Sequence, residues 1–126
     1  MNHRLAAIEW TDGHIKMFPM SGNGGLTPNP KCQGGYGDDR GAFSDPHNEF
    51  FLTGNGRVRV YDTITCTTVR QYSGAGAYGP NEIIIDTVND EMYVYMSDVS
   101  AVGVYYRNAP STTFDGIAKR WMPLSH

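Results

Sequence analysis

Apolar positions along the chain fall into short runs separated by turn residues, a pattern typical of β-strands rather than helices. The clearest unit is residues 79–105, GPNEIIIDTVNDEMYVYMSDVSAVGVY. It predicts three strands, at 83–85, 92–96 and 102–106, joined by two turns. The middle strand is apolar at nearly every position, as in a strand that is covered on both faces.

The same unit recurs along the chain with a period of 42 to 44 residues. Phe43 falls on Ile85 at an offset of 42, Ile8 on Phe51 at 43, and Val58 on Val102 at 44. A fourth strand is expected in each copy, near 30–33, 67–72 and 116–121. Four strands in a repeat of this length are typical of a β-propeller blade, whereas a β-sandwich does not require copies in register.

We therefore predict an all-β chain with about three four-stranded antiparallel β-propeller blades, at about 1–35, 36–78 and 79–122. The first blade begins on its second strand and lacks its inner strand. Trp121-Met122-Pro123 matches Tyr78-Gly79-Pro80 at an offset of 43, which predicts the start of a fourth inner strand. Because propellers have about four to eight blades, three blades leave an open ring. Self-association, such as two copies giving six blades, another propeller-forming chain or a longer parent chain would complete it.

Residues 79–109, GPNEIIIDTVNDEMYVYMSDVSAVGVYYRNA, resemble the repeat of NHL-like and lactonase-like β-propellers. The shared pattern is Gly-Pro, an apolar strand, Asp, a turn, an apolar strand, a turn and Val-x-Val-Tyr. Residues 15–30, IKMFPMSGNGGLTPNP, resemble the third strand and following loop of that repeat. The resemblance implies the fold. Because this superfamily includes hydrolases, ligand-binding modules and scaffolds, it does not imply one function.

Composition narrows the classes of function. The net charge is −3, 18% of residues are charged, and the chain has 15 glycines and 7 prolines. The sequence has no cluster of Lys and Arg residues, so it does not predict a nucleic-acid-binding face. It also has no apolar run long enough to span a bilayer. The first ten residues lack the apolar core of a signal peptide. The compartment stays open.

The two cysteines, Cys32 and Cys66, match no zinc-site spacing. Two buried or half-buried thiols are the expected arrangement. A disulfide forms only if the fold brings the two residues together, and oxidation would then indicate an extracytoplasmic setting.

The candidate metal ligands are Asp39, Asn81 and Glu82. The loops before the inner strands of a propeller open onto its central channel, and carboxylate and amide oxygens there suit calcium. Gluconolactonases, enzymes that this repeat resembles, hold a metal in this way. The alternative is that these residues begin strands and face water. No catalytic residue and no other cofactor is predicted.

The sequence favours a noncatalytic scaffold or interaction module that assembles through its open blade faces. One alternative is a metal-dependent lactonase-like hydrolase using Asp39, Asn81 and Glu82. Another is a carbohydrate- or peptide-binding module using exposed aromatic residues such as Trp10 and Trp121.

Overall fold

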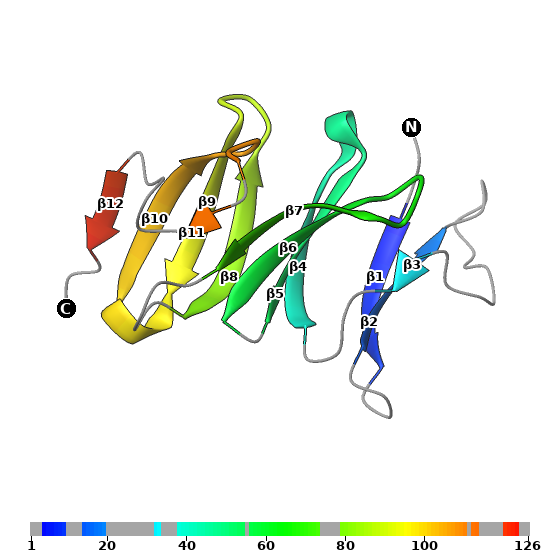
Figure 1. The fold of residues 1–126 in the computed structure, drawn as a ribbon, viewed down its shortest axis with the longest axis horizontal. Coiled ribbons are helices and arrows are strands. Elements are labelled where there is room, and N and C mark those ends of the chain that lie inside the picture. The colour runs from blue at the N-terminus through cyan, green and yellow to red at the C-terminus, as the bar shows by residue number, and fades with distance from the viewer. Residues whose placement is uncertain are drawn as a thin grey trace.

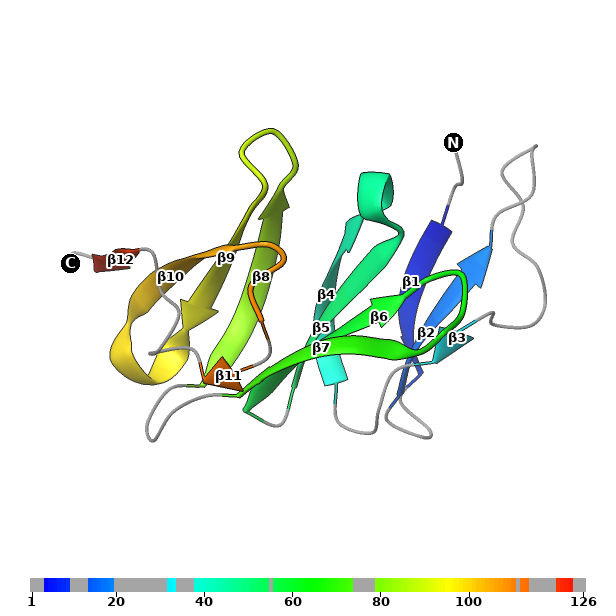
Figure 2. The same cartoon turned by 45° about the horizontal axis from the view of Figure 1, so that its top comes forward.

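Three β-sheets stand side by side in a row (Figures 1 and 2). The computed structural model describes residues 4–9, 14–19, 32–33, 38–54, 56–73, 79–110, 112–113 and 120–123. Within these residues the helical structure consists of two single turns, η1 (Asp45–His47) and η2 (Ser97–Val99). No helix in the described part of the chain has the length and apolar character needed to cross a membrane.

Each sheet is a propeller-type blade in which neighbouring strands follow one another along the chain, except at the outer edges of blades 2 and 3. Blade 1 contains β1 (Arg4–Glu9), β2 (His14–Pro19) and β3 (Cys32–Gln33). Blade 2 contains β4 (Asp38–Ser44), β5 (Glu49–Gly54), β6 (Arg57–Asp62) and β7 (Thr68–Ser73). Blade 3 contains β8 (Pro80–Asp86), β9 (Glu91–Met96), β10 (Ala101–Tyr106) and β12 (Arg120–Pro123). The predicted all-β blade architecture is confirmed, and the described part of blade 1 has no inner strand.

Blades 2 and 3 repeat each other in register as well as in strand order. Phe43 pairs with Phe50 between β4 and β5, and Ile85 pairs with Met92 between β8 and β9. The first pair of strands in each blade has a register shift at the same place, just before Arg40 in blade 2 and just before Glu82 in blade 3. The period read from the apolar pattern is therefore the period of the structure.

The turn between the first two strands also repeats. It ends on Asn48 in blade 2 and Asp90 in blade 3, with φ of 54° and 56°. Asn and Asp tolerate this left-handed conformation better than most residues because their short side chains bond locally. The carbonyl of Asn48 accepts the backbone N–H of Thr63 at 2.8 Å, and that of Asp90 accepts the N–H of Arg107 at 3.0 Å. Both blades thus have the same backbone corner.

The core lies between the blades. Side chains alternate along a strand, so β9 directs Met92, Val94 and Met96 toward blade 2. They pack there with Phe51, Val58, Val60 and Tyr72 of blade 2. A second cluster joins blades 1 and 2, where Met17 packs with Phe50 and Leu52. This placement explains why β5 is buried along its whole length: each of its faces covers a different neighbour.

Three features differ from the predicted blades. Ile8 does not fall on Phe51, because the connection between β1 and β2 is longer than that between β5 and β6 and the register aligns Ala6 with Phe51. Trp121-Met122-Pro123 does not begin a fourth inner strand, because it lies in β12 and pairs with β10 as the outer strand of blade 3. Blade 2 has a fifth strand, β11 (Thr112–Thr113), which comes from the connection after β10 and pairs in parallel with β7. The differences at β11 and β12 arise in the long connection after β10, where the repeat of apolar positions is interrupted.

Candidate functional site

A charged cluster joins blades 2 and 3 at the end of the core. Arg70 donates to both carboxylate oxygens of Glu49, at 2.7 and 2.9 Å, in the two-pronged geometry that an arginine fork favours. Arg107 of blade 3 donates to the same carboxylate. The side chains of Glu49, Arg70 and Arg107 are only 10%, 17% and 7% exposed. One carboxylate therefore holds two cations from different blades.

Two further contacts cross this junction to backbone carbonyls. Arg70 Nη2 donates to the carbonyl of Arg107 at 3.2 Å, and the Tyr72 hydroxyl donates to the carbonyl of Ala109. Arg107 Nε also donates to Asp90 within blade 3. The outer strand of blade 2 thus binds the segment that follows β10.

The carboxylates of this cluster are ionised at neutral pH. Burial raises the pKa of Glu49, but the hydrogen bonds and charges of Arg70 and Arg107 outweigh it and lower the pKa overall. The hydrogen bond from Arg107 lowers the pKa of Asp90. Because every charge is matched by an opposite one, the cluster is a structural junction rather than an acid–base site.

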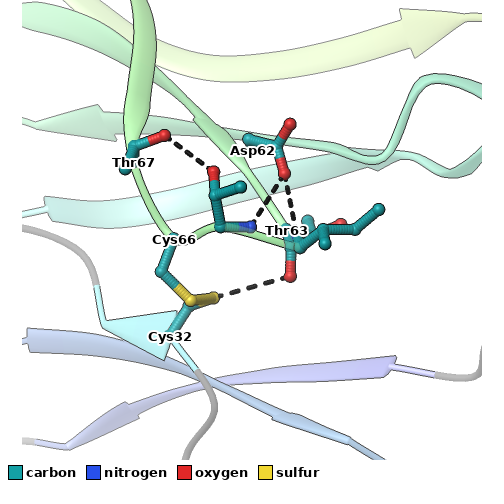
Figure 3. Close-up of a disulfide and its surroundings, with 7 residues drawn as sticks. Cys32, Asp62, Thr63, Cys66 and Thr67 are labelled. Carbon is teal, nitrogen blue, oxygen red and sulfur yellow. Dashed lines mark hydrogen bonds between the residues drawn. A yellow bond between two sulfur atoms is a disulfide. The ribbon is translucent and has the colours of Figure 1, made fainter.

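A disulfide joins blades 1 and 2. Cys32 in β3 bonds to Cys66 in the turn between β6 and β7, with an S–S distance of 2.03 Å and a Cα–Cα distance of 5.3 Å (Figure 3). The expectation of two separate thiols was wrong, because blade stacking places the short strand β3 beside this turn and brings the two cysteines together. Asp62 shapes the turn by accepting the backbone N–H groups of Ile64 and Thr65 at 2.7 and 3.0 Å.

The two junctions use one position in the blade. Cys32 pairs with Met17 across β3 and β2, and Arg70 pairs with Val60 across β7 and β6. Met17 falls on Val60 in the repeat, so Cys32 and Arg70 are equivalent.

Each of these two residues approaches a backbone carbonyl of the next blade, and the two carbonyls are at equivalent positions. Arg70 bonds to that of Arg107, and Cys32 Sγ lies 3.7 Å from that of Thr63 (Figure 3). The oxidised sulfur carries no hydrogen, so the second is a close contact. We name this the outer-strand linking position. In blade 3 it is occupied by Arg120, which pairs with Val104.

The face of blade 3 that points away from blade 2 has an apolar centre with acidic residues toward the strand ends. Strand alternation and register place Ile84, Tyr93, Val102, Val104 and Met122 on it, together with Glu82, Asp86 and Glu91. Ile84 is 68% exposed and Met122 37%, while Tyr93 and Val102 are half-buried and Val104 is fully buried. Tyr106, also on this face, is 57% exposed. We call this surface the open face of blade 3; no other described sheet lies against it (Figure 2).

The open face matches the face of blade 2 that blade 3 covers. The register places the following pairs at equivalent positions: Ala42 and Ile84, Phe51 and Tyr93, Val58 and Val102, Val60 and Val104, Tyr72 and Met122. All five blade 2 residues belong to, or pack against, the core between blades 2 and 3. Blade 3 thus repeats, on its far side, the apolar surface of an internal junction.

The predicted metal ligands lie within the first residues of the inner strands β4 and β8, not in the loops before them. Asn81 and Glu82 are exposed, the side chain of Asp39 lies outside the described residues, and Arg40 Nε lies 3.6 Å from Glu82 Oε1. Among the side chains that the structure describes, no three His, Cys, Asp or Glu residues are grouped to hold a metal ion. The calcium site stays a prediction.

Calorimetric titration with calcium tests this site directly. A cation bound by Asn81 and Glu82 requires Arg40 to move away, so the hypothesis predicts millimolar binding at best, lost in Glu82→Gln and strengthened in Arg40→Gln. Binding that Glu82→Gln leaves unchanged would remove Glu82 from the site.

The proposed aromatic surface is only partly described. Trp121 packs edge-on against Tyr105, with ring centroids 6.3 Å apart, and lies against the core between blades 2 and 3. Trp10 lies outside the described residues. Trp121 is therefore a packing residue.

No family model matches the chain, and no curated protein matches it. Among solved structures it is similar to the crystal structure of Kluyvelomyces marxianus Hsv2, a β-propeller protein, at 10% identity and a TM-score of 0.46. The match covers 90% of this chain and 49% of that one, so the chain spans about half the length of Hsv2. The blade architecture rests on strand order and register rather than on this likeness, and the NHL-like resemblance stays a prediction.

Proposed function

We propose that the chain is a noncatalytic β-propeller interaction module that assembles through its open blade faces. The observation that carries this proposal is the open face of blade 3, which repeats the residues that blade 2 buries beneath blade 3. A contiguous apolar sheet face of this kind is typical of an interaction surface. The disulfide supports an oxidising compartment, where such bonds persist.

The buried charged cluster supports a structural role for the blades themselves. Glu49 and Asp90 neutralise Arg70 and Arg107, and the contacts of Glu49 with both arginines fix blade 3 against blade 2. A rigid pair of blades presents the open face as a pre-formed surface, which lowers the entropic cost of binding.

Replacing Ile84 by aspartate is expected to abolish association. The side chain of Ile84 is 68% exposed in the single chain, so the substitution should change the stability of the folded chain little. In an interface it would bury an unpaired charge, which costs about 3 kcal/mol or more and weakens binding at least ~100-fold. Light scattering coupled to size-exclusion chromatography measures the change in mass.

Val88→Asp is the matched control. Val88 is 89% exposed and lies in the turn between β8 and β9, off the open face. It introduces the same charge into the same blade and should leave association unchanged. Equal masses for both variants and the wild type would contradict an interface at Ile84.

A further inference from the structure

We propose that the open face of blade 3 binds blade 1 of a second copy of this chain, head to tail, so that two copies close a ring. This inference rests on the proposed function and names its partner. It assigns different surfaces to the two sides of the contact: the open face of blade 3 on one copy, and the far face of blade 1 on the other.

The open face of blade 3 fits a partner with the shape of a β-blade. At the junction between blades 2 and 3, the equivalent surface of blade 2 is covered by the strands of a following blade, with Ile83, Met92 and Tyr105 packed on it. A surface with the same strand spacing and the same apolar positions fits another blade in the same relative orientation. The partner is therefore a β-blade rather than a helix or an extended peptide.

The far face of blade 1 carries an aromatic residue, Phe18. Met17 packs against blade 2, so its neighbour Phe18 lies on the opposite face of the strand. Phe18 pairs with Leu5, as Tyr61 pairs with Phe50 and Tyr105 with Met92.

These three aromatic residues hold one position in the three blades. Tyr61 packs against the core between blades 1 and 2, and Tyr105 is buried between blades 2 and 3. Each therefore packs toward the preceding blade. Blade 1 offers Phe18 at this position and has no preceding described blade, so its far face is the complement of the open face of blade 3.

Ring closure limits the assembly to a defined size. A head-to-tail contact gives either a closed ring or an open filament, depending on whether the rotations complete a full turn. Two copies of the three described blades give six, within the range of about four to eight that propellers adopt. Each such ring contains two identical contacts, and every described blade face then meets another blade.

Mixing two interface variants tests the head-to-tail contact. Tyr93→Asp disrupts the open face of blade 3, and Phe18→Asp disrupts the far face of blade 1. Each variant alone is expected to have the mass of one chain, 13.9 kDa. Their mixture retains one intact contact, between blade 3 of the Phe18 variant and blade 1 of the Tyr93 variant, so a one-to-one heterodimer should form. Phe18→Ala serves as a milder replacement if the aspartate variant does not fold, as judged by circular dichroism.

The outcomes separate this inference from the function on which it rests. A Phe18 variant that folds and associates like the wild type, beside a monomeric Tyr93 variant, would overturn the head-to-tail contact in favour of two blade 3 faces packed together. Association through the open face would then still stand. Two monomeric variants that do not combine on mixing would also overturn the inference. A wild type that is monomeric at every concentration would overturn both.

Discussion

Replacing Glu49 by alanine is expected to lower the free energy of unfolding by about 3 to 5 kcal/mol. Removing one partner from a buried ion pair leaves an uncompensated charge; here Arg70 loses its carboxylate and Arg107 keeps only Asp90. Since folded domains are stable by about 5 to 15 kcal/mol, the variant should be marginal. Urea unfolding followed by circular dichroism, at one fixed chain concentration, measures the difference.

The exposed ion pair between Arg40 and Glu82 provides the matched control. Both side chains are more than half exposed, at 56% and 60%, and exposed pairs contribute about 0 to 1 kcal/mol. Glu82→Ala should therefore unfold almost like the wild type. If Glu49→Ala cost no more than Glu82→Ala, the cluster between blades 2 and 3 would not be a stabilising junction.

The same cluster gives stability a defined pH dependence. The folded-state pKa of Glu49 is lowered, so its contribution is fully present above its unfolded pKa of about 4.3. It is lost as the pH falls through the lower folded value, when the carboxylate takes up a proton and releases both arginines. Asp90 acts in the same direction. Glu49→Gln should flatten this acid limb.

Removing the disulfide with the double variant Cys32→Ser, Cys66→Ser is expected to cost about 3 to 4 kcal/mol. The bond closes a loop between residues separated by 34 positions, which restricts the unfolded chain. It also ties β3, a strand of two residues, to the body of blade 2. Denaturant midpoints of the variant and the oxidised wild type give the difference.

The reduced wild-type protein is the control for this prediction. It keeps both sulfur atoms and should lose about as much stability as the double variant, because the cross-link is lost in both. A double variant within about 1 kcal/mol of the oxidised protein would show that β3 docks on blade 2 without the bond. Because Glu49 lies at the other junction, its effect should add to that of the disulfide.

Local apolar patterns predicted the strands well because each strand in a blade is short and consecutive with its partner. The runs at 92–96 and 102–106 became β9 and β10 within one residue at each start. The pattern failed at Trp121, where a long connection separates β10 from β12 and the repeat no longer keeps its spacing. The match of Trp121-Met122-Pro123 to residues 78–80 aligned the outer strand β12 with the start of the inner strand β8.

The junctions were missed because their contacts join residues far apart in sequence. Arg70 and Arg107 look like isolated surface cations until the register places both beside Glu49, and Cys32 reaches Cys66 only after blade 1 stacks on blade 2. The linking position also gave no signal in the sequence. Cys32, Arg70 and Arg120 follow Met17, Val60 and Val104 at unequal spacings, so they align only once the strand register is known.

Sedimentation equilibrium of the wild-type, oxidised chain over a range of concentrations tests the central claim most directly. The account predicts that the particle approaches twice the chain mass of 13.9 kDa and does not grow further, because a two-copy ring covers the open face of blade 3 and the far face of blade 1 in each copy. A mass of one chain at the highest concentration reached would contradict the claim that the open face of blade 3 is an association surface. Continuous growth with concentration would contradict the closed ring.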